Sequence, residues 1–247
     1  MLAIIGGSGL TQLSNLEVSR REVVRTPCGE PSGALIFGSI AGCEAVFLAR
    51  HGYGHTIPPH QVNYRANIWA LHAQGVKNVV AVAAVGGIRS DLAPGALVVP
   101  DQIVDYTHGR ACTFFTGGDT GVRHIDFTLP YCQALRAACL AAGWQAGESL
   151  IDGGVYAATQ GPRLETAAEI DRLERDGADM VGMTGMPEAA LAKEIGLCYA
   201  TIAVVANRAA GRGGGAGISM PDIAAVLEHA MGRVRSVLAK LVASDGG

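Results

Sequence analysis

Two long apolar runs constrain the fold more than any other feature of the sequence. The first, residues 79–85, holds seven consecutive apolar residues and ends in two glycines, and the second, residues 202–206, ends at Asn207. Neither run alternates with polar residues, and such runs are typical of strands covered on both faces of a sheet. Because helical patterns alternate with strand-like runs elsewhere, the sequence predicts an α/β fold, with a mixed central β-sheet flanked by helices on both faces.

Shorter patterns give the other expected elements. Strands are predicted at residues 3–5, 34–38, 45–49, 97–99, 102–106, 151–158, 180–181 and 197–206. Helices are predicted at residues 60–75, 133–142, 165–177, 187–195 and 220–242, and a polar, glycine-rich loop at 107–125. The 247 residues contain no repeat or linker, so residues 1–247 are expected to form a single domain.

Composition argues against several classes of function. A net charge of −3 without clustered Lys and Arg argues against nucleic acid as a partner. No segment approaches about 18 continuous apolar residues, so no membrane-spanning helix is expected. The start, MLAIIGGSGL, is interpreted as a first strand rather than a signal peptide. The six cysteines form no CxxC pair and are expected to be reduced, in a cytoplasmic protein: Cys28, Cys43, Cys112, Cys132, Cys139 and Cys198.

A glycine loop, GGSGL at residues 6–10, follows the first predicted strand. Its spacing fits neither GxGxxG nor GxxxxGK[ST], so neither nucleotide-binding fingerprint applies. Backbone N–H groups of such a loop, together with the Ser8 hydroxyl, can still hold an anion. The alternative is an ordinary turn that ends a strand.

A basic pair, Arg50 and His51, follows the predicted strand at 45–49. Ligands gather at the carboxyl ends of strands in open α/β sheets, and the guanidinium fork of Arg suits a phosphate. His51 and His55 are four residues apart, a spacing that on a helix would suggest a metal site. The glycines and prolines of this stretch argue against a helix, and no acidic or cysteine ligand is near, so no metal is expected.

Two further motifs combine with these. Thr184 comes between a short strand and a helix, where it could donate to an anion or simply cap the helix. Glu165 opens a predicted helix, where a negative charge is favourable in any case. Because Ser8, Arg50 and Thr184 all follow predicted strands, we expect them to converge on one phosphate. No motif offers a Ser-His-Asp or Cys-His arrangement by order or spacing.

The motifs taken together resemble the trimeric purine nucleoside phosphorylase and methylthioadenosine phosphorylase family. They occur in family order over almost the whole chain: GGSGL, LARHG, HQVNYRANIWAL, QGPRLET, GMTGMPEAALAKEIGLCYATIA and the AN that ends at Asn207. The resemblance implies that inorganic phosphate, as co-substrate, attacks the anomeric carbon of a purine nucleoside through an oxocarbenium-like state. It also implies that no metal or organic cofactor takes part.

The same resemblance assigns roles to residues. The phosphate site is expected to hold Ser8, Arg50, His51, Ala84 through its backbone, and Thr184. The catalytic residues are expected to be Arg50, His51 and Asn207. The residues expected to bind the nucleoside are Leu164, Glu165, Met183, Asn207, Arg208, Ala209, Met220 and Ile223. The family further implies a homotrimer, in which His124 is lent across the interface to the 5′ group of the nucleoside in the adjacent subunit.

Asn207 indicates which base is bound. An ionised Asp is an acceptor only and suits a 6-amino purine, whereas Asn can accept from ring nitrogen 7 and donate to a 6-oxo group. Adenine-specific relatives resemble this chain but carry one acid at this position and another two residues on, where this chain has Ala209. Glu165 also resembles the 6-oxopurine relatives. The expected base is therefore hypoxanthine.

The other end of the nucleoside is expected to meet apolar residues, because Ile218, Met220 and Ile223 stand where relatives that accept a free 5′-hydroxyl carry a His. An unpaired buried hydroxyl costs about 1–3 kcal/mol, so a methylthio group fits better. Met220 could instead pack in the core. The expected reaction is cleavage of S-methyl-5′-thioinosine to hypoxanthine and 5-methylthioribose 1-phosphate. The alternatives are a general inosine/guanosine phosphorylase and a non-catalytic purine-binding protein on the same fold.

Overall fold

Four parallel strands form the centre of the sheet in the computed structural model, which describes residues 1–214 and 217–245. β1 (Leu2–Gly6) lies between β4 (Cys43–Ala49) and β5 (Asn78–Gly87), and β5 pairs along its length with β11 (Cys198–Arg208). Both long apolar runs therefore lie in the middle of the sheet, as predicted. Gly215, at the end of the glycine-rich stretch after β11, lies outside the described residues.

The sheet branches at β5. Antiparallel β10 (Met180–Gly182) pairs with the carboxyl end of β5 and is followed by β9 (Val155–Ala158) and β7 (Gln102–Asp105). On the other branch, β11 is followed by β6 (Leu97–Val99) and β8 (Leu150–Asp152). The sheet thus combines parallel and antiparallel pairs, which confirms the predicted mixed sheet. The predicted strand at 151–158 is two strands, β8 and β9, in different branches.

One edge of the sheet was not predicted in full. β3 (Leu35–Ile40) and β4 form the expected hairpin, and β2 (Glu17–Glu22) adds an antiparallel strand beyond β3. The sequence of β2 is EVSRRE, and five of its six residues are exposed. A solvated edge strand carries neither an apolar run nor an alternating pattern, so sequence reasoning did not detect it.

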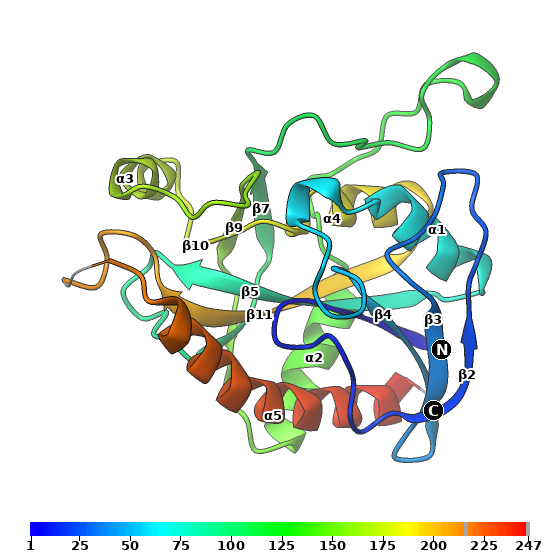
Figure 1. Cartoon of the computed structure of the whole chain (residues 1–247), viewed down its shortest axis with the longest axis horizontal. Helices are drawn as coiled ribbons and strands as arrows, with labels where there is room; N and C mark the ends of the chain where they lie inside the picture. Colours follow the sequence, from blue (N-terminus) through cyan, green and yellow to red (C-terminus); the bar gives the residue numbers. More distant parts are fainter. Residues whose placement is uncertain (215–216, 246–247) are drawn as a thin grey trace.

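Helices cover both faces of the sheet (Figure 1). α1 (Tyr64–Ala73) and α4 (Gly185–Glu194) pack on one face, and α2 (Gln133–Gln145) and α5 (Met220–Asp245) on the other. The two-sided burial is visible in β1, where Ala3 and Ile5 belong to the first core cluster and Leu2 and Ile4 to the second. α3 (Ala167–Arg175) lies at the periphery of the molecule (Figure 1). Single 3-10 turns occupy Pro59–Gln61 and Gly118–Thr120.

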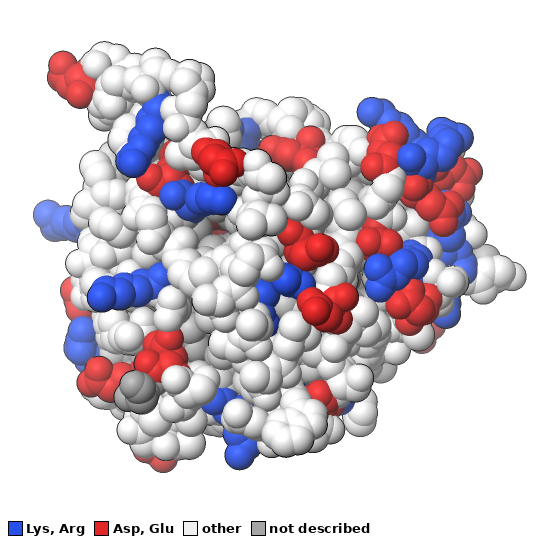
Figure 2. Space-filling view, turned by 180° about the vertical axis from the view of Figure 1, so that it is seen from behind, with Lys and Arg blue, Asp and Glu red and all other residues white. Residues whose placement is uncertain are grey.

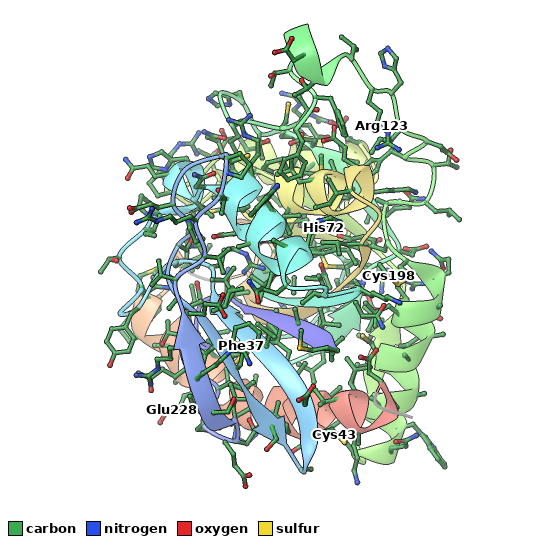
Figure 3. The ribbon with its side chains drawn as sticks, turned by 90° about the vertical axis from the view of Figure 1, so that its right-hand side faces the viewer. Phe37, Cys43, His72, Arg123, Cys198 and Glu228 are labelled. Carbon is green, nitrogen blue, oxygen red and sulfur yellow. A yellow bond between two sulfur atoms is a disulfide. The ribbon has the colours of Figure 1, made fainter. Side chains whose placement is uncertain are left out.

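Cys132 and Cys198 form a disulfide, with their Cα atoms 5.2 Å apart. Cys132 caps the start of α2 and Cys198 begins β11, where Figure 3 labels it. The expectation that all six cysteines are reduced is therefore wrong for this pair. The two residues are 66 positions apart in the sequence, and only the packing of α2 beside β11 brings them together.

On the face shown in Figure 2, basic and acidic side chains are interspersed. This face shows no extended basic patch of the kind that nucleic acid binds. Within residues 1–214 and 217–245, no helix combines the length and the apolar character that a bilayer crossing requires.

The strand ends converge on one region. β1, β4, β5 and β11 are parallel, so their carboxyl ends lie at the same edge of the sheet. The bulge in β11 between Val205 and Asn207 shifts the register of this strand just before its end. β10 runs antiparallel to β5, with Met180 opposite Gly87 and Val181 opposite Gly86, so it begins at this edge and its carboxyl end lies beside the carboxyl-terminal half of β5. The fold thus brings together the motifs that follow these strands.

Candidate active site

A cavity of about 420 Å³ opens at the converging strand ends. Its walls come from the loops after β1, β4, β10 and β11, from the middle of β5 and from the start of α5. All the residues predicted to bind phosphate line it: Ser8, Arg50, His51, Ala84 and Thr184. The predicted convergence of strand-end residues on one site is therefore seen in the structure.

The glycine loop brings the chain close to Arg50. The Leu10 N–H donates to the Gly7 carbonyl at 3.0 Å, which closes the tight turn after β1. A Cβ on Gly7 would lie 2.5 Å from the backbone oxygen of Val82 and 2.8 Å from Nη1 of Arg50, so no larger residue fits there. The half-buried Ser8 follows at the cavity wall.

Arg50 is held by a carboxylate beneath the cavity. Its Nε and Nη2 donate to the two carboxylate oxygens of Glu188 at 2.7 and 2.8 Å, and Nη1 donates to the Val82 carbonyl at 3.0 Å. The Arg50 and Glu188 side chains are 1% and 0% exposed. Burial works against the charged form of Arg50, but Glu188 outweighs this effect, and the pKa of the guanidinium is raised.

The pairing corrects one detail of the sequence interpretation. The edge of the guanidinium that was expected to grip phosphate with two hydrogen bonds is occupied by Glu188. Three of the five N–H groups of Arg50 have protein partners, which leaves two for the cavity. Arg50 can therefore offer a bound phosphate a fixed positive charge and two N–H donors. Its Nε/Nη2 edge is not free for phosphate, because it binds Glu188.

Glu188 was not predicted as a functional residue. It lies on α4, whose buried positions are otherwise mostly apolar. Its Oε1 also accepts from the Tyr199 hydroxyl at 2.8 Å, and burial, followed by the nearby Glu188, raises the pKa of Tyr199 well above its ordinary value. A lone carboxylate within the run MPEAALA was a usable signal, because buried acids need a charged or hydrogen-bonding partner.

His51 is a neutral hydrogen-bond acceptor toward the cavity. Its Nδ1 lies 2.9 Å from the Ile57 carbonyl, and because a carbonyl can only accept, Nδ1 carries the proton. Burial, the charge of Arg50 and the neighbouring His55 lower the pKa of His51 to about 4, against a smaller opposing effect of Ile57. At neutral pH, Nε2 therefore has a free lone pair that can accept from a protonated oxygen.

His51 and His55 lie close together, with ring centroids 4.5 Å apart, and both line the cavity. Across residues 1–214 and 217–245, no three His, Cys, Asp or Glu side chains gather in a way that could hold a metal ion. The stretch Thr56–Pro59 lines the cavity beside His55 and was not predicted as part of the site.

Thr184 is not a simple helix cap. It is the N-cap of α4, yet its side chain makes no capping hydrogen bond, and it is buried at the cavity wall. Its backbone N–H donates to the Tyr156 hydroxyl at 3.4 Å. The buried hydroxyl beside a helix N-terminus favours the interpretation as an anion donor over the capping alternative.

Glu165 faces the cavity rather than serving α3. The first turn of α3 is stabilised by a capping box made by Thr166 and Glu169, not by Glu165. Instead, Glu165 Oε1 accepts from the Thr159 hydroxyl at 2.6 Å, and Glu165 lines the cavity. The alternative that it merely places a charge at a helix end is not supported.

The end of β11 places its residues on two sides. Asn207 and Ala209 line the cavity, and Asn207 Nδ2 donates to the Arg208 carbonyl at 2.7 Å, which leaves one N–H and Oδ1 of the amide. The Arg208 side chain points away and donates to the Ser90 carbonyl at 3.1 Å. Successive side chains of a strand lie on opposite faces, and Arg208, predicted to bind the nucleoside, does not line this cavity.

One end of the cavity is apolar. Ile218, Met220, Ile223 and Leu227, around the start of α5, form this wall. Met220 is 62% exposed, so it does not pack in the core, and that alternative is wrong. Leu164 also lines the cavity, on the side of Glu165.

Met183 lines the cavity, but His124 does not. His124 is exposed on the long loop after β7, next to Arg123, which Figure 3 labels and whose Nη1 donates to the Glu194 carbonyl at the end of α4 at 3.3 Å. If His124 acts on a nucleoside, it acts on one held elsewhere than in the cavity of its own chain.

Curated proteins of known sequence resemble the chain closely. A protein of Pseudomonas syringae pv. tomato, named probable S-methyl-5′-thioinosine phosphorylase, is 54% identical over 98% of this chain and 98% of its own length. A protein of Xanthomonas campestris pv. campestris with the same name is 48% identical over 97% and 96%. The 6-oxopurine nucleoside phosphorylase of Pyrococcus furiosus is 47% identical over 86% and 81%.

Solved structures share the fold. Methylthioadenosine phosphorylase from Schistosoma mansoni, in complex with adenine, superposes with a TM-score of 0.94 at 32% identity and covers 99% of this chain and 91% of its own. The sequence profile of the Phosphorylase superfamily matches residues 1–243. With the strand ends, the cavity and these relatives in agreement, the chain belongs to the Phosphorylase superfamily.

Proposed function

We propose that the protein is a pentosyltransferase that cleaves S-methyl-5′-thioinosine with inorganic phosphate. The products are hypoxanthine and 5-methylthioribose 1-phosphate. The observation that carries the proposal is the division of one cavity into three parts: anion donors at Ser8 and Thr184, an amide at Asn207, and an apolar wall at the start of α5. The names of the relatives at about half identity agree with this substrate.

The geometry accounts for the phosphate half of the reaction. Ser8, Thr184 and the free N–H groups of Arg50 can hold phosphate beside the anomeric carbon, and His51 Nε2 can accept from a protonated phosphate oxygen. A phosphate oxygen then forms a bond to the anomeric carbon while the bond to purine nitrogen 9 breaks. Aligning both reactants and fixing charge in advance lowers the barrier without a covalent enzyme intermediate.

The purine half needs hydrogen-bond partners, because the electron pair of the broken bond stays on the leaving base. Asn207 Oδ1 can accept from a protonated ring nitrogen 7, and its remaining N–H can donate to the 6-oxo group. Glu165, which Thr159 holds in place, can accept from the N–H at ring position 1. These pairings support hypoxanthine as the leaving base, with Met183 beneath the sugar.

The experiment that tests this function is a phosphorolysis panel with inosine, adenosine, methylthioinosine and methylthioadenosine, each with and without phosphate. We expect methylthioinosine to be cleaved most efficiently, and only with phosphate. We propose that no metal or organic cofactor takes part, so dialysis against EDTA should leave the rate unchanged. Efficient cleavage of methylthioadenosine, or release of base without phosphate, would contradict the proposal.

A general inosine/guanosine phosphorylase is the second candidate. It is supported by the relatives named 6-oxopurine nucleoside phosphorylases, which are 46–49% identical to the chain. The apolar wall that includes Met220 and Ile223 argues against it, because a free 5′-hydroxyl there would lack a partner from this wall. The panel separates the two candidates by the ratio of catalytic efficiencies for methylthioinosine and inosine. A purely non-catalytic purine-binding role does not agree with the phosphorylase relatives.

We further propose a homotrimer in which His124 completes the site of an adjacent subunit. The support is that His124 is exposed and does not line the cavity of its own chain. We expect His124→Ala and Asn207→Ala each to lose most activity as pure trimers. Co-expression of the two variants should restore activity, because sites with an intact Asn207 can then receive His124 from the other variant.

Two observations would overturn this assembly. One is an active monomer in sedimentation at the assay concentration. The other is co-expressed variants that stay as inactive as the pure ones while sedimenting as mixed trimers, because His124 would then not be shared between subunits.

A further inference from the structure

Arg110, on the long loop after β7, binds the backbone of two neighbouring segments that carry residues of the cavity wall. Its Nη1 donates to the carbonyls of Met183 at 2.8 Å and Met186 at 2.6 Å. Its Nη2 donates to the carbonyls of Thr159 at 3.2 Å and Gln160 at 2.8 Å. A single half-buried guanidinium thus holds four carbonyl groups that belong to two separate segments.

The two segments carry residues of the nucleoside half of the site. The ribose loop, residues 183–186, carries Met183 and also Thr184 of the phosphate site, and it runs into the first residues of α4. The base loop, residues 159–165, carries Glu165. The loops touch each other, because a Cβ on Gly161 would clash with Sδ of Met183. Arg110 bridges them, since each of its terminal nitrogens binds one loop. Its position therefore fixes how far apart the sugar and base contacts lie.

The surroundings of Arg110 keep the side chain in place. Nε donates to the Gln160 side-chain carbonyl at 3.1 Å, and Nη1 to the Tyr64 hydroxyl at 3.3 Å. The guanidinium carbon lies 5.4 Å from the centre of the Tyr64 ring. Among the described residues, no carboxylate forms a salt bridge with Arg110. A planar fork can span two loops in this way, whereas the single ammonium group of Lys cannot.

The phosphate half of the site is held by other groups. Glu188 fixes Arg50, and the Tyr156 hydroxyl accepts from the Thr184 N–H. The Arg50–Glu188 pair does not involve Arg110, whereas Thr184 lies between Met183 and Met186, whose carbonyls Arg110 holds. Loosening Arg110 is therefore expected to disturb sugar and base binding most, and phosphate binding less, because Arg50 stays in place.

We propose that Arg110 is a positioning residue for the nucleoside half of the site. It sets the separation of the ribose loop and the base loop and does not itself touch the substrate. The proposal rests on the proposed function, in that nucleoside and phosphate are taken as the two substrates.

The test compares Arg110→Met and Arg110→Lys with the wild-type protein, with nucleoside and phosphate varied separately. For Arg110→Met we expect kcat/KM for the nucleoside to fall about tenfold to a hundredfold, because small displacements of positioned groups have effects of this size. The KM for phosphate should rise by a smaller factor, because Glu188 keeps Arg50 in place while only Thr184 is loosened. The kcat/KM of Arg110→Lys for the nucleoside should lie between that of the wild-type protein and that of Arg110→Met. Added methylguanidine should partly restore the kcat/KM of Arg110→Met for the nucleoside.

Arg136→Met is the matched control. Arg136 also donates to backbone carbonyls, those of Val99 and Pro100, but neither carbonyl belongs to a residue that lines the cavity. Unlike the half-buried Arg110, Arg136 is buried and forms a salt bridge with Asp152. The melting temperature of this control should fall. At an assay temperature at which the control is still folded, its KM for the nucleoside and its KM for phosphate should both be unchanged. If Arg110→Met behaves like the control, or if the KM for phosphate rises as much as the KM for the nucleoside, Arg110 is only structural and the proposal is wrong.

Failure of the proposed function gives a different pattern. In that case the wild-type protein does not cleave the nucleosides of the panel. Calorimetric binding of hypoxanthine then still tests Arg110, because the base loop holds its position with or without catalysis. Unchanged hypoxanthine affinity in a folded Arg110→Met variant would overturn the proposal on its own.

Discussion

Replacing both Asn207 and Ala209 by Asp is expected to move substrate preference from 6-oxo toward 6-amino purines. A 6-oxo group facing a carboxylate sets acceptor against acceptor, whereas a 6-amino group donates to it. Each mismatch is worth about 1–3 kcal/mol, so the ratio of catalytic efficiencies for methylthioinosine and methylthioadenosine should change by roughly tenfold to a hundredfold. Glu165 will limit the change, because it still favours a base edge that donates.

In the structure, Asp at position 207 would lose one hydrogen bond, and Asp at position 209 would have space for its side chain. Asp at position 207 cannot donate to the Arg208 carbonyl, as Asn207 does at 2.7 Å, so the side chain has to rotate. Ala209 is 3% exposed and lies beside Gly86, which has no side chain to compete for the space. The new carboxylate at 209 is therefore expected to face the cavity.

Ala209→Asn is the matched control, because it fills the same space as Asp without adding a charge. This control should lower the catalytic efficiency for both methylthioinosine and methylthioadenosine, without making methylthioadenosine the preferred substrate. If the wild-type protein already prefers methylthioadenosine to methylthioinosine, Asn207 does not select a 6-oxo purine. It is not the base-contacting residue at all if the ratio stays constant in a folded double variant.

Arg50→Ala is expected to lower stability as well as phosphate use. It leaves the fully buried Glu188 without its charged partner, and breaking such a pair costs about 3–5 kcal/mol. For a chain of this size, that corresponds to a fall in melting temperature of roughly 6–20 °C. Turnover at saturating nucleoside should also fall, because the fixed positive charge at the phosphate site is gone.

The double variant Arg50→Met with Glu188→Gln separates the two effects. It removes both buried charges, while Gln still offers an acceptor to the Tyr199 hydroxyl. Calorimetric unfolding should show that most of the lost stability returns, because no uncompensated charge remains buried. Phosphate-dependent activity should stay lost. If Arg50→Ala is as stable as the wild-type protein, Glu188 does not depend on Arg50; if the double variant regains activity, Arg50 does not serve phosphate.

The sequence by itself determined the central strands and the gathering of the site at their ends. Runs such as residues 79–85 can only be buried on both faces, because no polar position marks a solvent side. Parallel strands then place whatever follows them at one edge. For this reason Ser8 and Arg50 were found together without knowledge of any contact, and both line the cavity. Thr184 joins them although it follows β10, which runs antiparallel to β5, so its position depends on the tertiary structure.

Only the tertiary structure decided which way side chains point and what lies beneath them. Arg208 follows Asn207 directly, yet the pleat of β11 turns it to the opposite face. Glu188 comes 138 residues after the arginine that it holds, and Cys198 comes 66 residues after its disulfide partner. Local patterns carry no information on such distant pairs, because packing between elements creates them.

The same limit applies to Arg110, which lies in a polar loop without any local signal. Its partners are backbone carbonyls, and a carbonyl is present at every residue, so no sequence pattern can reveal which ones an arginine binds. The strand ends of a parallel sheet are a consequence of hydrophobic burial, which local sequence encodes. The supports that hold the site in shape are consequences of three-dimensional proximity, which local sequence does not encode.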